Sequence, residues 1–143
     1  MKLSTKSRYA VMAMAYIAKH RDRQPISLQE IATDQKISLS FLEQIFYKLR
    51  QNNIVTSIRG PRGGYQINIE LSDISISKIF TAVDESFKMT RCSKGVGCIE
   101  KSAKCMTHDL WKGMTTNMIS YLNSISLEDL INNNINGHGH LLR

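Results

Sequence analysis

The residues best suited to metal chemistry lie in one short segment in the second half of the chain. All three cysteines fall in it, with a histidine close behind: Cys92, Cys98, Cys105 and His108. Thiolates and imidazoles are the ligands that thiophilic metals and iron–sulfur clusters select. Gly95 and Gly97 allow the backbone between the first two cysteines to bend. We therefore predict a metal or iron–sulfur site. A structural Zn²⁺ site is the alternative, although the spacing is wider than in common zinc fingers.

Composition places this segment in a single compact domain, with or without an added oligomerisation element. The chain has 143 residues, of which 42% are hydrophobic, enough for a core. No apolar run is long enough to cross a bilayer, and the N-terminus does not resemble a signal peptide. We expect a cytoplasmic protein with no membrane partner. In that reducing compartment clustered cysteines bind metal more often than they form disulfides.

The distribution of charge points to nucleic acid. Residues 1–65 carry 11 Lys and Arg against 4 Asp and Glu, whereas residues 66–143 carry 8 of each. The whole net charge of +7 therefore lies in the first half. This asymmetry is expected of a half that faces a polyanion, and an ordinary solvated basic face is the alternative.

A helix-turn-helix pattern lies in the same half. Ser27-Leu-Gln-Glu30 predicts a capping box for a helix to about Gln35, Lys36-Ile37 a tight turn, and Ser38 the cap of a second helix to about Asn52. The second helix has an apolar stripe of Leu39, Leu42, Ile45, Phe46 and Leu49. Its polar face carries side chains that contact base edges, namely Ser40, Glu43, Gln44 and Tyr47. We expect Lys48 and Arg50 to contact phosphates.

The flanking segments complete a winged helix, a mainly α fold with a small β-wing. A preceding helix over 5–19 has the stripe Tyr9, Met12, Ala13, Tyr16 and Ile17. Lys6 and Arg8 at its start oppose the helix dipole unless they meet phosphates. Strands are expected over 54–58 and 65–69, joined by a turn with Arg59 and Arg62, which would enter a minor groove or contact phosphates.

The second half predicts a helix over 75–83 and a long helix after His108. The first has an inward face of Ile76, Ile79, Phe80 and Val83. The long helix carries a heptad-like seam of Trp111, Met114, Met118, Tyr121 and Ile125. We expect this seam to form a two-fold dimer; the alternative is that it covers its own domain. A short helix over 127–131 follows. The expected division is a DNA-binding domain (1–72), a sensing and dimerisation region (73–131) and a flexible tail (132–143).

These motifs together resemble the iron–sulfur cluster regulators among the bacterial winged-helix repressors. The resemblance runs from Met1 to about residue 130, and its anchors are Met1–Ala10, Ser40–Gln44, Arg59–Tyr65 and Cys92–Trp111. It implies a [2Fe–2S] cluster bound by Cys92, Cys98, Cys105 and His108, base contacts from Ser40, Glu43 and Gln44, and minor-groove insertion of Arg59. It also implies a homodimer on a palindromic operator that represses cluster-assembly genes when loaded, with the assembly scaffold as cluster donor.

One feature departs from that family. Six residues separate Cys98 from Cys105, where the family usually has five. The histidine argues against the nitric-oxide-sensing branch, which uses a carboxylate as fourth ligand, and the cysteine triad argues against the cysteine-metabolism branch. A regulator with structural zinc or a nitric-oxide-sensing cluster stays as the alternative. An iron–sulfur carrier or redox enzyme is disfavoured, because the sequence shows no acid/base or nucleophile constellation.

Overall fold

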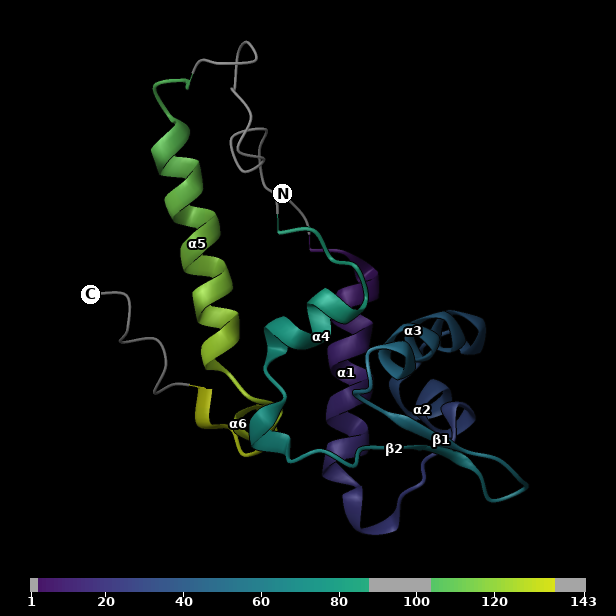
Figure 1. Ribbon diagram of the computed structural model, residues 1–143. Coiled ribbons are helices and arrows are strands. Elements are labelled where there is room, and N and C mark those ends of the chain that lie inside the picture. The colour runs from purple at the N-terminus through teal and green to yellow at the C-terminus, as the bar shows by residue number, and fades with distance from the viewer. Residues whose placement is uncertain (1–2, 88–103, 136–143) are drawn as a thin grey trace.

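The computed structural model describes residues 3–87 and 104–135 (Figure 1). Within them, α1 is the central helix and is contacted by four other helices. The helices are α1 (Thr5–Lys19), α2 (Leu28–Gln35), α3 (Leu39–Gln51), α4 (Ile76–Ala82), α5 (His108–Ser124) and α6 (Leu127–Ile131). Strands β1 (Thr56–Ile58) and β2 (Gly64–Gln66) pair antiparallel, and 3-10 turns lie at η1 (Arg21–Arg23) and η2 (Leu71–Asp73). The predicted fold class, mainly α with a small β-wing, is confirmed.

Serine side chains begin five of these helices, because each accepts a hydrogen bond from a backbone N–H of the first turn that has no partner within the helix. The caps are Ser4, Ser27, Ser38, Ser75 and Ser126. The predicted box at Ser27 forms only in part. Ser27 caps Glu30 N–H at 3.1 Å, but the Glu30 carboxylate accepts hydrogen bonds from Arg23 and from the Tyr16 hydroxyl. These two donors hold the pKa of Glu30 below its ordinary value.

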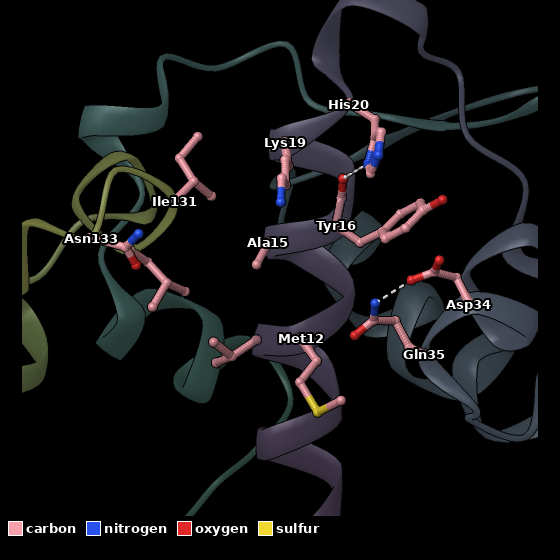
Figure 2. Close-up of a pocket in the computed structure, with 11 residues that line it drawn as sticks. Met12, Ala15, Tyr16, Lys19, His20, Asp34, Gln35, Ile131 and Asn133 are labelled. Carbon is pink, nitrogen blue, oxygen red and sulfur yellow. Dashed lines mark hydrogen bonds between the residues drawn. The ribbon is translucent and has the colours of Figure 1, made fainter.

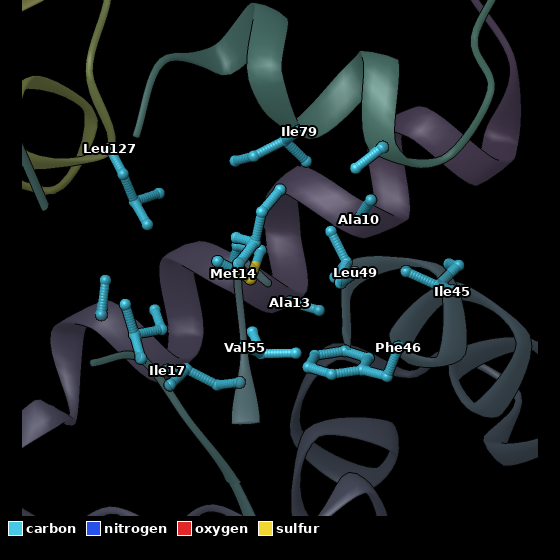
Figure 3. Close-up of a cluster of buried hydrophobic side chains, with 14 of the residues drawn as sticks. Ala10, Ala13, Met14, Ile17, Ile45, Phe46, Leu49, Val55, Ile79 and Leu127 are labelled. Carbon is cyan, nitrogen blue, oxygen red and sulfur yellow. The ribbon is translucent and has the colours of Figure 1, made fainter. Parts of the chain in front are cut away.

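The core lies between α1, α3 and α4, with α6 closing one side (Figure 3). The predicted stripe of α1 was shifted by about one position. Ala10, Met14 and Ala18 are buried, whereas Met12 and Tyr16 are half-buried on an outer face. The small alanine side chains allow α1 to approach its neighbours closely. A hydrophobic pattern that is judged by large side chains does not identify these alanines as core residues.

The apolar stripe of α3 is confirmed except at its start. Four of its members are fully buried: Leu42, Ile45, Phe46 and Leu49. Leu39 is 36% exposed, because it is the first helical residue and precedes the turn that packs on α1. The turn before it is tight as predicted. Lys36 has a left-handed backbone with φ 54°, and Ile37 N–H donates to Ala32 O at 3.1 Å.

The wing strands are shorter than predicted, and Tyr65 in the middle of β2 forms a second backbone pairing outside the hairpin. Tyr65 exchanges two hydrogen bonds with Ile26, at 2.9 and 2.8 Å. This pairing attaches the wing to the loop before α2, and the Tyr65 ring packs on Phe46 with centroids 4.9 Å apart. Ile54 and Val55, expected in the first strand, are instead buried in the core.

The C-terminal segment returns to the body of the domain after α5. Ile76 N–H donates to Ile125 O at 2.9 Å and Leu127 N–H to Ile74 O at 2.7 Å. Ile125 is only 4% exposed, since it is part of the core of its own domain, and it lies beyond the end of α5. It is therefore not available to the dimer seam in which we expected it. The inward face predicted for residues 76–83 is confirmed. Ile135, within the tail expected over 132–143, packs partly buried on the same core, and residues 136–143 lie outside the described residues.

Within residues 3–87 and 104–135, no helix has the length and hydropathy needed to cross a membrane.

Candidate nucleic-acid interface

The polar face of α3 is open to solvent, as a base-reading surface must be. Ser40, Glu43, Gln44 and Tyr47 are all exposed, Tyr47 by 53%. The Tyr47 hydroxyl accepts a hydrogen bond from Gln51 Nε2 at 2.9 Å. Glu43 and Gln44 form no side-chain hydrogen bond with any group in the described residues. Their acceptor and donor groups are therefore available to a ligand.

Cations lie beside this face, at the C-terminal end of α3. Arg50 is exposed, and its guanidinium donates to Ser57 Oγ in β1 at 3.4 Å. Lys48 is ion-paired with Asp84, which follows α4. Lys48 holds the pKa of the Asp84 carboxyl below its ordinary value, and the more distant Lys6 adds to this effect.

The wing lies on the same side of the molecule as α3, and α5 lies on the other side (Figure 1). Arg59 and Arg62 are exposed in the turn between β1 and β2. The turn is tight, with Gly63 N–H donating to Gly60 O at 2.9 Å. A Cβ on Gly63 would lie 2.1 Å from Ile58 O, so the hairpin requires glycine there.

The start of α1 places two further cations beside a small polar cluster. Lys6 is half-buried and Arg8 is exposed. The Glu85 carboxylate accepts hydrogen bonds from the hydroxyls of Ser4 and Ser7, and Ser7 is fully buried. Glu85 thus fixes the chain that leaves α4 against the first turn of α1.

Only part of the predicted metal-ligand set lies in the described residues. Cys92 and Cys98 lie outside them. Cys105 is partly exposed just before α5, and His108 is the first residue of that helix and is buried. His108 N–H donates to Cys105 O at 3.1 Å, so a single turn joins these two residues. Within residues 3–87 and 104–135, no three His, Cys, Asp or Glu side chains converge. The donor set of three thiolates and one imidazole nevertheless fits an iron–sulfur cluster chemically.

Four of the five residues predicted for the dimer seam lie on α5 and are partly or fully exposed to solvent. Met114 is 40% exposed, and Trp111, Met118 and Tyr121 are half-buried. Leu110 is 60% exposed beside them and was not predicted. The Trp111 indole N–H donates to Thr107 Oγ1 at 3.0 Å, which leaves the ring along the helix surface.

A groove of about 660 Å³ lies along the outer face of α1, between α6 and the end of α2 (Figure 2). Its lining includes Met12, Ala15, Tyr16 and Ile131. None of the candidate DNA-contacting, metal-binding or dimerisation residues lines this groove.

Sequence reasoning missed Asp84 and Asn52, which join the ends of α3 and α4. Asn52 Nδ2 donates to Ala82 O at 3.4 Å and to Lys48 O at 2.8 Å. The only signal in the sequence is the acidic pair Asp84-Glu85 after an apolar helix. That pattern does not identify Lys48 as a partner 36 residues away.

Comparisons with known proteins agree with this arrangement. The model of the Rrf2 family, described as iron-dependent transcriptional regulators, matches residues 3–133. The HTH-type transcriptional regulator IscR of Photorhabdus laumondii is 45% identical over 133 residues, which are 93% of this chain and 80% of the relative. Its counterpart in Serratia proteamaculans is 44% identical over the same lengths.

Two solved structures are also similar. T. potens IscR aligns with a TM-score of 0.77 and 32% identity, over 93% of this chain and 88% of that one. CymR (YrzC), the global cysteine regulator of B. subtilis, aligns with a TM-score of 0.79 and 30% identity, over 92% and 97%. Backbone similarity thus establishes the winged-helix fold without separating these two regulators. The family match establishes that this chain belongs to the Rrf2 family of iron-dependent transcriptional regulators, which bind DNA and are not enzymes.

Proposed function

We propose that this chain is a cytoplasmic, homodimeric transcription regulator that senses iron–sulfur clusters and mainly represses cluster-assembly genes. In this proposal residues 1–72 read DNA, and residues 73–131 bind a [2Fe–2S] cluster and dimerise. The observation that carries it is the solvent-open polar face of α3 with cations from α1, α3 and the wing around it, in an iron-dependent family. The cluster-assembly scaffold would supply the cluster.

The DNA-binding role follows from charge and exposure. Ser40, Glu43 and Gln44 would contact base edges, and Tyr47 would lie beside them. Lys6, Arg8, Lys48 and Arg50 would neutralise phosphates, and Arg59 and Arg62 would reach the minor groove or its phosphates. A two-fold dimer presents two α3 helices, so the operator would be palindromic.

The dimer role rests on the exposed apolar surface of α5. Leu110 and Met114 are 60% and 40% exposed on a helix that extends away from the body of the domain (Figure 1). Trp111, Met118 and Tyr121 continue that surface, whereas Ile125 belongs to the core of its own domain. A second copy of α5 is the expected cover.

The cluster would be held by Cys92, Cys98, Cys105 and His108. When bound, such a cluster supplies a site whose occupancy depends on iron supply and oxidants. His108 is buried at the first turn of α5, so ligation there would constrain the start of the dimer helix. The chain would thereby convert cluster occupancy into a change in how the two α3 helices are spaced.

Glu43 is the residue expected to govern operator choice. An exposed carboxylate on the DNA-facing side is unfavourable near phosphates unless a cytosine amino group pairs with it. Glu43→Ala should widen the range of duplexes bound by the cluster-free protein, whereas Glu128→Ala, an exposed acid in α6, should not. Equal site preference of Glu43→Ala and wild type in gel shifts would reject this role.

The decisive experiment is anaerobic purification with iron and sulfide analysis, visible absorption and salt-dependent duplex binding, for wild type and Cys92→Ala. The expected result is two iron and two sulfide per chain, visible colour, and operator binding that changes when the cluster is lost. A colourless protein containing zinc would support the structural-zinc alternative. Selective loss of DNA binding on exposure to nitric oxide would support the nitric-oxide-sensing alternative. Colour without any duplex binding would indicate a carrier and reject the regulator.

A further inference from the structure

The C-terminal ends of α3 and α4 are joined by side chains. Lys48 of α3 pairs with Asp84, and Asn52 at the end of α3 donates to Ala82 O in α4 at 3.4 Å. The same Asn52 amide donates to Lys48 O at 2.8 Å. The segment after α4 is thus held against the end of the helix that carries the base-reading face.

The backbone at Asp84 is fixed independently of its side chain. Asp84 N–H donates to Thr81 O at 3.1 Å, and Glu85 N–H donates to Phe80 O at 3.0 Å. Asp84 has φ 60°, in the left-handed region that aspartate and asparagine tolerate better than other residues with a side chain. This turn directs the carboxylate toward Lys48.

The pairing sets Lys48 apart from the other candidate phosphate-contacting cations. Two ion pairs occur among residues 3–87 and 104–135, and the second joins Arg23 to Glu30, neither of which is a candidate phosphate-contacting residue. Among Lys6, Arg8, Lys48, Arg50, Arg59 and Arg62, Lys48 is therefore the only one paired with a carboxylate of the described residues. The side chain of Asp84 is 64% exposed, so the pair is open to solvent and can exchange for another anion.

We propose that Asp84 acts as an electrostatic brake on DNA binding, because Lys48 must leave its carboxylate before it can neutralise a DNA phosphate. The proposal rests on the DNA-binding role assigned to α3 above. An exposed ion pair of this kind is expected to lower affinity about two- to fivefold for each Lys48. In a two-fold dimer the combined effect is roughly four- to 25-fold. Asp84 is thus a tuning residue that keeps non-specific binding weak.

The test is duplex binding by the full chain, measured by fluorescence anisotropy over a salt series with a mixed-sequence duplex. Asp84→Asn removes the charge and keeps a residue suited to the left-handed backbone. It should tighten binding by the factor above at low salt. Because Lys48 contacts a phosphate in both proteins, the slope of log K against log salt should stay close to that of wild type, and the gain in affinity should shrink as added salt screens the ion pair. Asp73→Asn, an exposed acid in η2, is the control with the same charge change.

A double-mutant cycle identifies the partner. In a Lys48→Gln background, Asp84→Asn should have no further effect on affinity or on the salt slope. Asp84→Gly, which also suits the left-handed backbone, repeats the test if the asparagine variant unfolds.

The outcomes separate the brake from the proposed function. Binding by wild type with no change in Asp84→Asn overturns the brake alone. An equal gain in Asp73→Asn, or a gain that persists without Lys48, also overturns it, because either would reflect net charge. A wild-type chain that binds no duplex at low salt overturns the DNA-binding role itself.

Discussion

Replacing Gly64 by alanine should displace the wing from the domain. Gly64 begins β2, and a Cβ there would lie 2.3 Å from Ile26 O and 2.8 Å from Ser27 N. Ordinary contact needs about 3.4 Å, so the two backbones must separate by roughly 1 Å. The hydrogen bonds between Tyr65 and Ile26, at 2.9 and 2.8 Å, cannot both survive such a shift.

The magnitude follows from these contacts. Two backbone hydrogen bonds contribute about 1–3 kcal/mol, and disturbance of the Ser27 cap of α2 adds about 1 kcal/mol. The expected loss is about 2–4 kcal/mol. For a chain of this size it corresponds to a fall in Tm of roughly 6–15 °C. Thermal unfolding followed by circular dichroism measures it, and urea unfolding checks that the m-value is unchanged.

Gly113→Ala is the matched control. Gly113 lies within α5, and apart from its own stretch of helix no atom of the described residues comes within 4 Å of a Cβ built there. This substitution should raise stability by up to about 1 kcal/mol, because alanine favours the helix over glycine. If Gly64→Ala melts within a degree or two of wild type, the wing is not fixed to the loop before α2 as described.

Three other perturbations test the core, the acid response and the dimer. Phe46→Ala empties a fully buried site and should lower the free energy of unfolding by about 3–5 kcal/mol, measured by urea titration; a loss under 1 kcal/mol would contradict its place in the core. Since the pKa of Glu30 is held below its ordinary value of 4.5, mainly by Arg23, ionised Glu30 stabilises the fold above pH 4.5, and this contribution is lost as pH falls through the lowered pKa. Glu30→Gln should therefore make Tm less sensitive to pH in acid; an unchanged pH profile would show that the contact contributes nothing. Met114→Asp should convert the proposed dimer to monomer in sedimentation velocity, whereas Thr116→Asp on another face of α5 should not; a monomeric wild type would reject the seam.

The sequence patterns predicted most of the elements, because they depend on local chemistry. Serine caps and the apolar stripe of α3 need only neighbouring residues to be recognised. The register of α1 was less predictable, since Ala10 and Ala18 contribute little to a hydrophobic pattern yet allow close helix contact. The Glu30 carboxylate accepts a hydrogen bond from Arg23 and not from the backbone N–H of Ser27, as a capping box would require, because Arg23 is a charged donor.

The exposed residues of the candidate site could be predicted from the sequence, but the contacts between its elements could not. The exposure of Glu43 and Gln44 follows from helical periodicity alone. The pairing of Lys48 with Asp84 depends on how α4 packs on α3, which no local pattern encodes. Ile125 fits a heptad by spacing, but its carbonyl is needed to pair with Ile76, so the helix ends before it.

The hydrogen bonds between residues 74–76 and 125–127 have a consequence for variation among relatives. They bring together two points that are about fifty residues apart in the chain. Adding one residue to a flexible part of this interval raises the entropy cost of closing it by only about 0.02 kcal/mol, because that cost grows with the logarithm of the length. The sixth residue between Cys98 and Cys105 falls in that interval, so the spacing of the proposed cluster ligands can change at little cost to the body of the domain.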